Sequence, residues 1–259
     1  MNNNHKKWTS VQAALRSARL RSVAAICAVV LLTGCTDLGY LLSNDKVTDA
    51  DNNKVVFVGD SIFALSGEIQ NILESRANET FRRYTVSGAQ LSGALIAPSI
   101  PDQFREAVSD NPDIDIMVGD AGGNDILIPA IAFNSNSCKT PWYRFGRLSQ
   151  KCKDFIDNIY VEGVDFLNEM AGAGVKHGIL VGYYYTKNGL FPLKDMKEAV
   201  DYGNATLIRA CENSVLNCTF VDPRSVINNR DIIFDGIHPA DSGSLKIADL
   251  IWPKLQPLL

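Results

Sequence analysis

Short apolar runs alternate with longer segments of helical periodicity from residue 55 to the end of the chain. The short runs are rich in β-branched or aromatic residues and predict buried strands at Val55–Val58, Tyr84–Val86, Ile114–Val118, Gly178–Tyr183 and Thr219–Val221. Apolar residues at helical spacing predict helices at Ile62–Ala77, Gln103–Val108, Phe155–Ala171, Asp195–Glu212 and Ser242–Leu255. Such alternation implies right-handed crossovers and a parallel sheet with helices on both faces. The pattern therefore predicts an α/β fold, a three-layer α/β/α sandwich around a five-stranded parallel sheet.

The beginning of the chain has the layout of a secretory signal. Basic residues precede an apolar run, Val23–Leu32, that is too short to span a bilayer comfortably. The run ends in Leu32-Thr33-Gly34-Cys35, which resembles the bacterial lipobox. The resemblance implies that residues 1–34 are removed and that Cys35 carries the lipid that holds the protein on a membrane. A plain signal peptide is the alternative. Thr36, where an aspartate would suggest retention in the inner membrane, favours the outer membrane of a bacterial cell envelope.

Two further segments lack a regular pattern. The polar stretch after the cysteine predicts a tether at residues 35–53, with a single folded domain at residues 54–259. The segment from Ile126 to Lys153 is longer than an ordinary connection and contains Trp142, Tyr143 and Phe145. It is either a functional loop or a stapled surface loop.

Formal charge indicates no partner. The chain has 25 basic and 29 acidic residues, a net charge of −4 and a sequence pI of about 5.4. There is no broad basic field that would bind nucleic acid or draw the body of the protein onto anionic lipid. The oligomeric state is left open.

Four cysteines follow the proposed anchor, an even number in an oxidising compartment. Of the three possible connectivities we expect the sequence-local pairs, Cys138–Cys152 and Cys211–Cys218, because each closes a short polar segment between predicted elements. A zinc site is the competing interpretation. It is disfavoured because no two of these cysteines have the spacing of a zinc knuckle and histidines are scarce.

Candidate catalytic residues come directly after predicted strands, at the strand ends where open α/β sheets bind their ligands. Gly59-Asp60-Ser61 follows the first predicted strand, and it places a serine at the start of a helix. A serine nucleophile needs a base, usually a histidine. His5 lies in the export signal, and His177 precedes a strand and so falls at the opposite edge of the sheet. His238 remains, with Asp235 three residues upstream to orient it.

A third strand end carries Gly122-Gly123-Asn124-Asp125, in which the amide of Asn124 is able to donate to an oxyanion. Asp125 is expected to hydrogen-bond to neighbouring backbone rather than to react. For Asp120 a plain strand-end role is favoured over a functional one. The aromatic residues Tyr183, Tyr184 and Tyr185, together with those of the long segment, are candidates for a wall that contacts substrate.

Together these blocks resemble the SGNH hydrolase family, also called GDSL-type, over nearly the whole domain. The resemblance implies a flavodoxin-like fold in which Ser61 attacks the acyl carbon, His238 transfers the proton and Asp235 orients His238. It also implies an oxyanion hole formed by the backbone N–H groups of Ser61 and Gly88 and by the side chain of Asn124. The second block departs from the family pattern, so Gly93 is a second candidate for the position of Gly88.

The function that this resemblance implies is hydrolysis of carboxylic esters through an acyl-enzyme, with no metal or organic cofactor. Expected substrates are small-molecule esters, lipid esters or acylated glycans. Deacetylation of envelope carbohydrate and acyl transfer on the same fold are alternatives. A further alternative is a non-catalytic lipoprotein that binds a ligand. It is disfavoured because a binding module does not need a nucleophile, a base and an orienting carboxylate together. A nucleotide-binding domain is set aside because the first strand lacks the glycine-rich loop.

Overall fold

The computed structural model describes residues 43–93, 97–187 and 193–259. The predicted signal peptide, residues 1–34, and the lipid attachment at Cys35 lie outside these residues, as does the first part of the predicted tether. In the described part of the chain, no helix is both long and apolar enough to cross a bilayer.

One sheet of six strands forms the centre of the fold, in the order β1-β3-β2-β4-β5-β6. The strands are β1 (Asn44–Val47), β2 (Asn52–Val58), β3 (Phe81–Val86), β4 (Ile116–Gly119), β5 (His177–Val181) and β6 (Asn217–Val221). Strands β2 to β6 are parallel to one another, which confirms the five predicted parallel strands. The sheet is mixed because β1 pairs antiparallel with β3 at the edge.

The edge strand β1 is the main departure from the predicted fold. Residues 44–53 were assigned to the tether, which is wrong, because Asn44 to Val47 pair with β3 and β2 begins at Asn52. The Asp45 carboxylate also forms a salt bridge of 3.1 Å with Arg83 on β3. An edge strand is half exposed and can be polar throughout, so it carries no strong hydrophobic signal.

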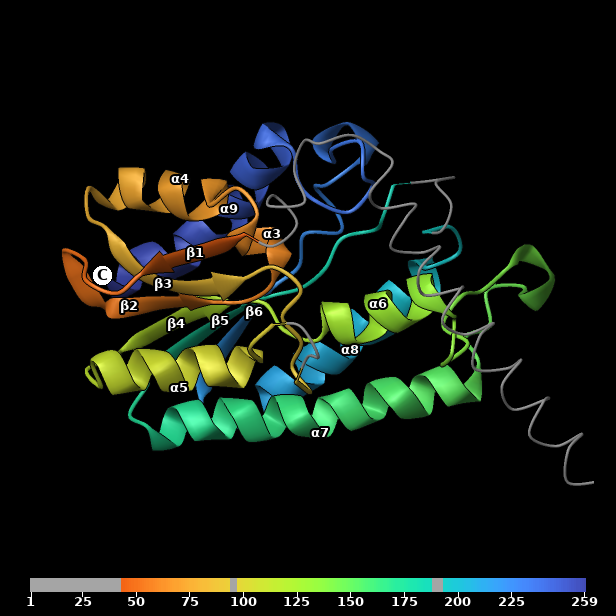
Figure 1. Cartoon of the computed structure of the whole chain (residues 1–259), viewed down its shortest axis with the longest axis horizontal. Helices are drawn as coiled ribbons and strands as arrows, with labels where there is room; N and C mark the ends of the chain where they lie inside the picture. Colours follow the sequence, from red (N-terminus) through yellow and green to blue (C-terminus); the bar gives the residue numbers. More distant parts are fainter. Residues whose placement is uncertain (1–42, 94–96, 188–192) are drawn as a thin grey trace, which may run out of the picture. The chain divides into compact units, whose positions relative to one another are not determined.

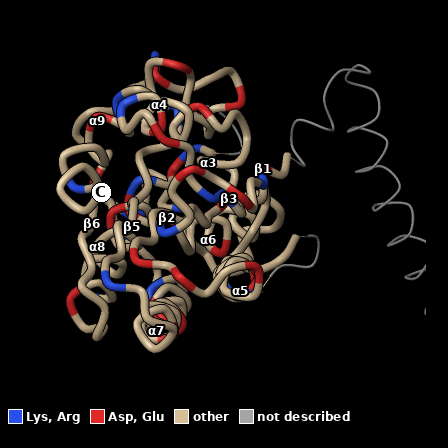
Figure 2. Tube along the Cα trace, turned by 90° about the vertical axis from the view of Figure 1, so that its left-hand side faces the viewer, with Lys and Arg blue, Asp and Glu red and all other residues tan. Residues whose placement is uncertain are grey.

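The helices cover both faces of the sheet, as predicted (Figure 1). Helices α3, α4 and α9 supply residues to one apolar core, and α5, α7 and α8 to the other. The helices are α3 (Ser61–Ala64), α4 (Glu68–Ala77), α5 (Ile100–Asp110), α6 (Gly123–Ala132), α7 (Gln150–Gly172), α8 (Lys197–Asn213) and α9 (Asp241–Leu255). Among the described residues, short 3₁₀ helices lie at Trp142–Arg144, Asn229–Asp231 and Gln256–Leu258. Acidic and basic positions are interspersed along the described chain (Figure 2).

The helix predicted at residues 62–77 is in fact two helices. Gly67 lies between them in the left-handed region, with φ of 64°. A side chain there would be strained, and its Cβ would lie 3.1 Å from the carboxylate of Asp45. The break leaves α3 as a single turn that begins with Ser61.

The long segment from Ile126 to Lys153 is only partly irregular. Helix α6 runs to Ala132. The sequence analysis did not predict this helix because Gly122 precedes it, Gly123 begins it and Pro129 lies inside it. The remainder is closed by the Cys138–Cys152 disulfide. The second predicted pair, Cys211–Cys218, is also formed, so both predicted disulfides are confirmed. The aromatic residues Trp142, Tyr143 and Phe145 are exposed.

Candidate active site

The turn between β2 and α3 presents Ser61 at the carboxyl edge of the sheet. The carboxylate of Asp60 caps α3 by accepting a hydrogen bond of 2.9 Å from the backbone N–H of Ile62. Glycine is required at position 59, because a Cβ there would lie 2.4 Å from the Asp120 carboxyl oxygen. The sequence Gly-Asp-Ser thus builds a close-packed turn with the serine at the first helical position.

Ser61, His238 and Asp235 form one continuous hydrogen-bonded chain. His238 Nε2 lies 2.8 Å from Ser61 Oγ, and His238 Nδ1 lies 2.6 Å from Asp235 Oδ2. A carboxylate accepts at Nδ1, so Nδ1 carries the proton and Nε2 offers its lone pair to the serine hydroxyl. Ser61 and His238 are buried at 9% and 6% exposure, which limits competition from bulk water. The three residues predicted for catalysis are therefore brought together.

The carboxylate of Asp235 is fixed by its own short loop. Its Oδ1 accepts hydrogen bonds from the backbone N–H groups of Ile237 and His238, at 2.9 and 3.0 Å. Burial opposes ionisation of Asp235, but the hydrogen bonds from His238 and Ile237 outweigh it and lower the pKa of Asp235 below its usual value. Asp235 is thus ionised at neutral pH. The hydroxyl of Tyr184 donates to the carbonyl of Ile237 at 2.6 Å and ties this loop to the end of β5.

Two further carboxyl groups, those of Asp60 and Asp120, lie beside the turn that carries Ser61. Asp120 Oδ1 accepts a hydrogen bond of 2.7 Å from the backbone N–H of Asp60, and Asp60 Oδ2 accepts one of 2.9 Å from the hydroxyl of Tyr183. Burial raises the pKa of Asp60, and burial together with the charge of Asp60 raises that of Asp120 well above its usual value. Sequence reasoning assigned Asp120 a plain strand-end role, whereas the structure places it against the nucleophile turn.

The loop after β3 is bound to the loop that carries Asn124. The Asn124 amide donates to the carbonyl of Ala89 at 3.0 Å, and the Asp125 carboxylate accepts from the backbone N–H groups of Leu91 and Ser92 at 2.8 and 3.0 Å. Asp125 therefore serves the loop, as predicted. Gly88, the residue before Ala89, is half-buried and has φ of 79°.

Gly93 has a different environment from Gly88. A Cβ added at Gly93 would meet no atom within 4 Å, whereas Gly88 lies two residues after the end of β3, beside the Asn124 loop. The structure gives this reason to prefer Gly88 of the two, and the oxyanion hole of Ser61, Gly88 and Asn124 stays a prediction.

His177 occupies the first position of β5, at the opposite end of that strand from the nucleophile edge. Its Nδ1 lies 3.0 Å from the side-chain amide of Asn217. This placement agrees with its exclusion as the base. In the part of the chain that the structure describes, no three histidine, cysteine or acidic residues are grouped so as to hold a metal ion.

Known structures resemble this arrangement across most of the chain. A protein of Slackia heliotrinireducens, provisionally classed as an SGNH hydrolase, has a TM-score of 0.50 at 14% identity, over 78% of this chain and 97% of its own. The chain has the SGNH-hydrolase fold. A family 3 carbohydrate esterase of Talaromyces cellulolyticus has a TM-score of 0.55 at 18% identity, over 79% and 96% of the two chains. The carbohydrate acetylesterase Est24 of Sinorhizobium meliloti has a TM-score of 0.52 at 13% identity, over 79% and 99%.

Sequence comparison adds nothing to this likeness. No protein-family model and no curated protein matches the chain. At the identities of the solved structures the likeness shows the SGNH-hydrolase fold alone, so the chemistry of the site rests on its own geometry.

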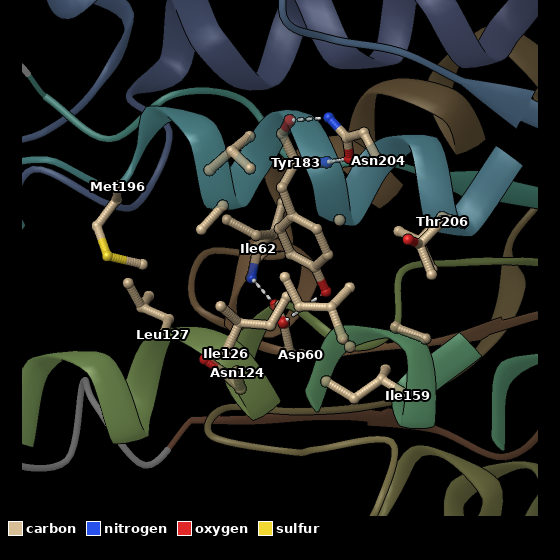
Figure 3. Close-up of a pocket in the computed structure, with 18 of the residues that line it drawn as sticks. Asp60, Ile62, Asn124, Ile126, Leu127, Ile159, Tyr183, Met196, Asn204 and Thr206 are labelled. Atoms are coloured by element: carbon tan, nitrogen blue, oxygen red, sulfur yellow. Dashed lines mark hydrogen bonds between the residues drawn. The ribbon is translucent and has the colours of Figure 1, made fainter. Parts of the chain in front are cut away.

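A pocket of this SGNH fold opens beside Ser61 and Asn124 (Figure 3). Tyr183 and Tyr184 line it, which agrees with the predicted aromatic wall. Tyr185 instead donates to Asp201 at 2.6 Å. Trp142, Tyr143 and Phe145 are not among the described residues that line the pocket, so their proposed part in the wall is not supported.

Proposed function

We propose that the protein is a serine esterase that hydrolyses carboxylic esters through an acyl-enzyme. The observation that carries this proposal is the unbroken hydrogen-bonded chain from Asp235 through His238 to Ser61, with Nε2 at 2.8 Å from Oγ. A hydroxyl, an imidazole and an ionised carboxylate in this order activate the serine by removing its proton as it attacks. The SGNH-hydrolase fold of the neighbours is consistent with this chemistry.

The reaction has two halves. Ser61 Oγ attacks the ester carbonyl while its proton passes to His238 Nε2, and Asp235 stabilises the imidazolium that forms. Backbone N–H groups of Ser61 and Gly88 and the amide of Asn124 are assigned to the oxyanion. His238 then gives its proton to the leaving alcohol, which departs as the acyl-enzyme forms. A water molecule, deprotonated by His238, then attacks the acyl carbon. His238 returns this proton to Ser61 Oγ as the bond between Oγ and the acyl carbon breaks and the acid is released.

Deacetylation of carbohydrate is the second candidate. It is favoured by the names of two structural neighbours, a family 3 carbohydrate esterase and a carbohydrate acetylesterase. Acyl transfer uses the same acyl-enzyme, with a sugar hydroxyl in place of water, and is a third outcome of the same chemistry.

Hydrolysis of a panel of p-nitrophenyl esters and acetylated sugars by the wild-type protein and Ser61→Ala tests the proposal. We expect ester cleavage by the wild type only, and labelling of the wild type only by a fluorophosphonate probe that reacts with activated serines. A folded protein that cleaves no ester and is not labelled would move the assignment to a non-catalytic binding protein.

We propose further that the protein is exported and anchored by lipid on Cys35, on the outer membrane of a bacterial cell envelope. The support is the sequence Leu32-Thr33-Gly34-Cys35 after an apolar run. Expression in a bacterium with a radiolabelled fatty acid tests this: the label should enter the wild type and be lost in Cys35→Ser. An unlabelled wild-type protein of the mass expected for plain signal cleavage would exclude the anchor.

A further inference from the structure

The pocket beside Ser61 extends deep into the helical layer formed by α6, α7 and α8. Figure 3 shows Leu127 and Met196 at one end and Ile159 and Thr206 at the other, with the ring of Tyr183 between them. The wall is almost wholly apolar. A pocket of this kind suits a hydrocarbon chain and offers few partners to the hydroxyl groups of a sugar.

Small residues on one face of α8 keep this space open. Ala199, Gly203 and Ala210 all line the pocket, and they recur at intervals of four and seven residues. From Ala199 to Ala210 the helix rises about 16 Å, at about 1.5 Å per residue. Gly163 on α7 lines the same space. Glycine destabilises the interior of a helix relative to alanine, so Gly163 and Gly203 lower the stability of α7 and α8. The open space that they leave in the pocket is a functional reason for glycine at both positions.

The position of the pocket relative to the catalytic groups tells which half of an ester it accepts. Ser61 and Asn124 line the pocket, whereas His238 is not among its described lining residues. His238 must reach the oxygen of the leaving alcohol in order to protonate it. The alcohol therefore lies on the His238 side of the attacked carbonyl, and the acyl group lies on the pocket side.

We infer that this pocket binds a linear acyl chain of medium length, so that the natural substrate is a lipid-like ester rather than an acetyl ester. The inference rests on the proposed ester hydrolysis. An acetyl group fills only the mouth beside Ser61. Each further methylene buried against the apolar wall is expected to raise kcat/KM about fourfold, up to the length at which the pocket is full.

The test compares p-nitrophenyl esters from acetate to dodecanoate on three forms of the full chain: wild type, Gly203→Leu and Gly172→Leu. A Cβ at residue 203 would lie 3.4 Å from Ile126 Cδ1, so a leucine there fills the pocket. A Cβ at residue 172, also in a helix, would meet no atom within 4 Å, which makes Gly172→Leu a matched control. Binding of free decanoate is measured by calorimetry on the same forms.

We expect kcat/KM of the wild type to rise at least tenfold from acetate to its optimum among the longer esters. Gly203→Leu should lose most of that gain, so that its ratio of long-ester to acetate kcat/KM falls, while Gly172→Leu keeps the wild-type ratio. If acetate is the best substrate and longer esters decline steadily, the acyl pocket is refuted while the esterase stands. If no ester is cleaved, the proposed function fails, and the binding of decanoate then decides about the pocket. Decanoate binding to the wild type that Gly203→Leu abolishes would support the acyl pocket. No binding of decanoate to the wild type would refute it.

Discussion

Asp120 accepts a hydrogen bond of 2.7 Å from the backbone N–H of Asp60, the residue directly before the nucleophile. Its other carboxyl oxygen is buried without a hydrogen-bond partner among the described residues. Burial and the neighbouring charge of Asp60 raise the pKa of Asp120 well above its usual value. We therefore assign the proton of the pair to Asp120 and the negative charge to Asp60, whose carboxylate accepts from Ile62 and Tyr183.

Asp120→Asn is expected to keep activity and to lose less stability than the wild type as the pH rises. An acid whose pKa is raised on folding binds its proton more tightly in the folded state, so the wild type loses stability as the pH rises from its unfolded value toward its folded one. Asparagine keeps an acceptor for the Asp60 N–H and does not titrate. Urea unfolding at about pH 4 and about pH 8 should show a smaller loss for Asp120→Asn than for the wild type.

Asp120→Leu is the control for this assignment. It leaves the buried N–H of Asp60 without an acceptor, which costs about 1–3 kcal/mol, and it loosens the turn that holds Ser61. We expect lower stability and a lower kcat. Equal pH dependence of unfolding in the wild type and Asp120→Asn would show that Asp120 carries no unusual proton.

Asp235→Asn is the same chemical change as Asp120→Asn, but it should abolish most of the activity that Asp120→Asn keeps. An amide offers His238 Nδ1 a donor or a neutral acceptor and cannot stabilise the imidazolium, so kcat should fall by about 10⁴ with the fold retained. Circular dichroism and kcat on one activated ester measure both effects. A loss of less than tenfold would mean that Asp235 does not orient the base.

The catalytic residues could be predicted because each lies in a short local motif at a strand end. Gly59-Asp60-Ser61 and the Asp235–His238 loop each build their geometry within four residues. The supporting groups could not be predicted in this way. The Tyr183–Asp60 contact joins residues 123 positions apart, and Tyr184 and Ile237 are 53 positions apart. Such contacts depend on the strand order, which periodicity does not determine.

The same distinction holds for the fold. Buried parallel strands are apolar on both faces and are visible in the sequence, as β2 and β4 are. Strand β1 was missed because its residues, Asn44 to Val47, alternate between exposed and half-buried positions and are mostly polar. Helix α6 was missed because glycines stand at its beginning and Pro129 lies inside it, which are signals of a turn rather than of a helix.

Asn124→Ala tests the amide donor of the oxyanion hole. We expect kcat to fall about 100-fold to 1000-fold with little change in KM, because the donor acts on charge that develops only in the transition state. The free energy of unfolding should fall only modestly, since a single hydrogen bond, to the Ala89 carbonyl, is lost. A rise in KM at constant kcat would instead assign Asn124 to substrate binding.

Alanine at the two glycine candidates tests the backbone donor. Both positions have positive φ, so each variant should lose some stability. Gly93→Ala should keep its kcat because its Cβ meets open space. Gly88→Ala should lose kcat, because strain there shifts the N–H that is assigned to the oxyanion. The reverse result would transfer the donor to Gly93.

The two disulfides are expected to have similar effects on stability and different effects on specificity. Their sequence separations are 14 and 7, and in the loop-entropy model removal of Cys138–Cys152 and of Cys211–Cys218 costs about 3 and about 2.5 kcal/mol. Cys138 and Cys152, however, belong to the same apolar cluster as Met196 and Ala199, which line the pocket beside Ser61.

Replacing Cys138 and Cys152 by serine should therefore lower kcat/KM for long esters more than for acetate, because the pocket end near Met196 loses its support. The matched variant, with serine at Cys211 and Cys218, should keep the wild-type ratio of long-ester to acetate activity at a similar loss of stability. Urea unfolding and the ester series measured on both variants separate the two effects. Parallel changes in both variants would mean that the ratio follows global stability and that the 138–152 loop does not shape the acyl site.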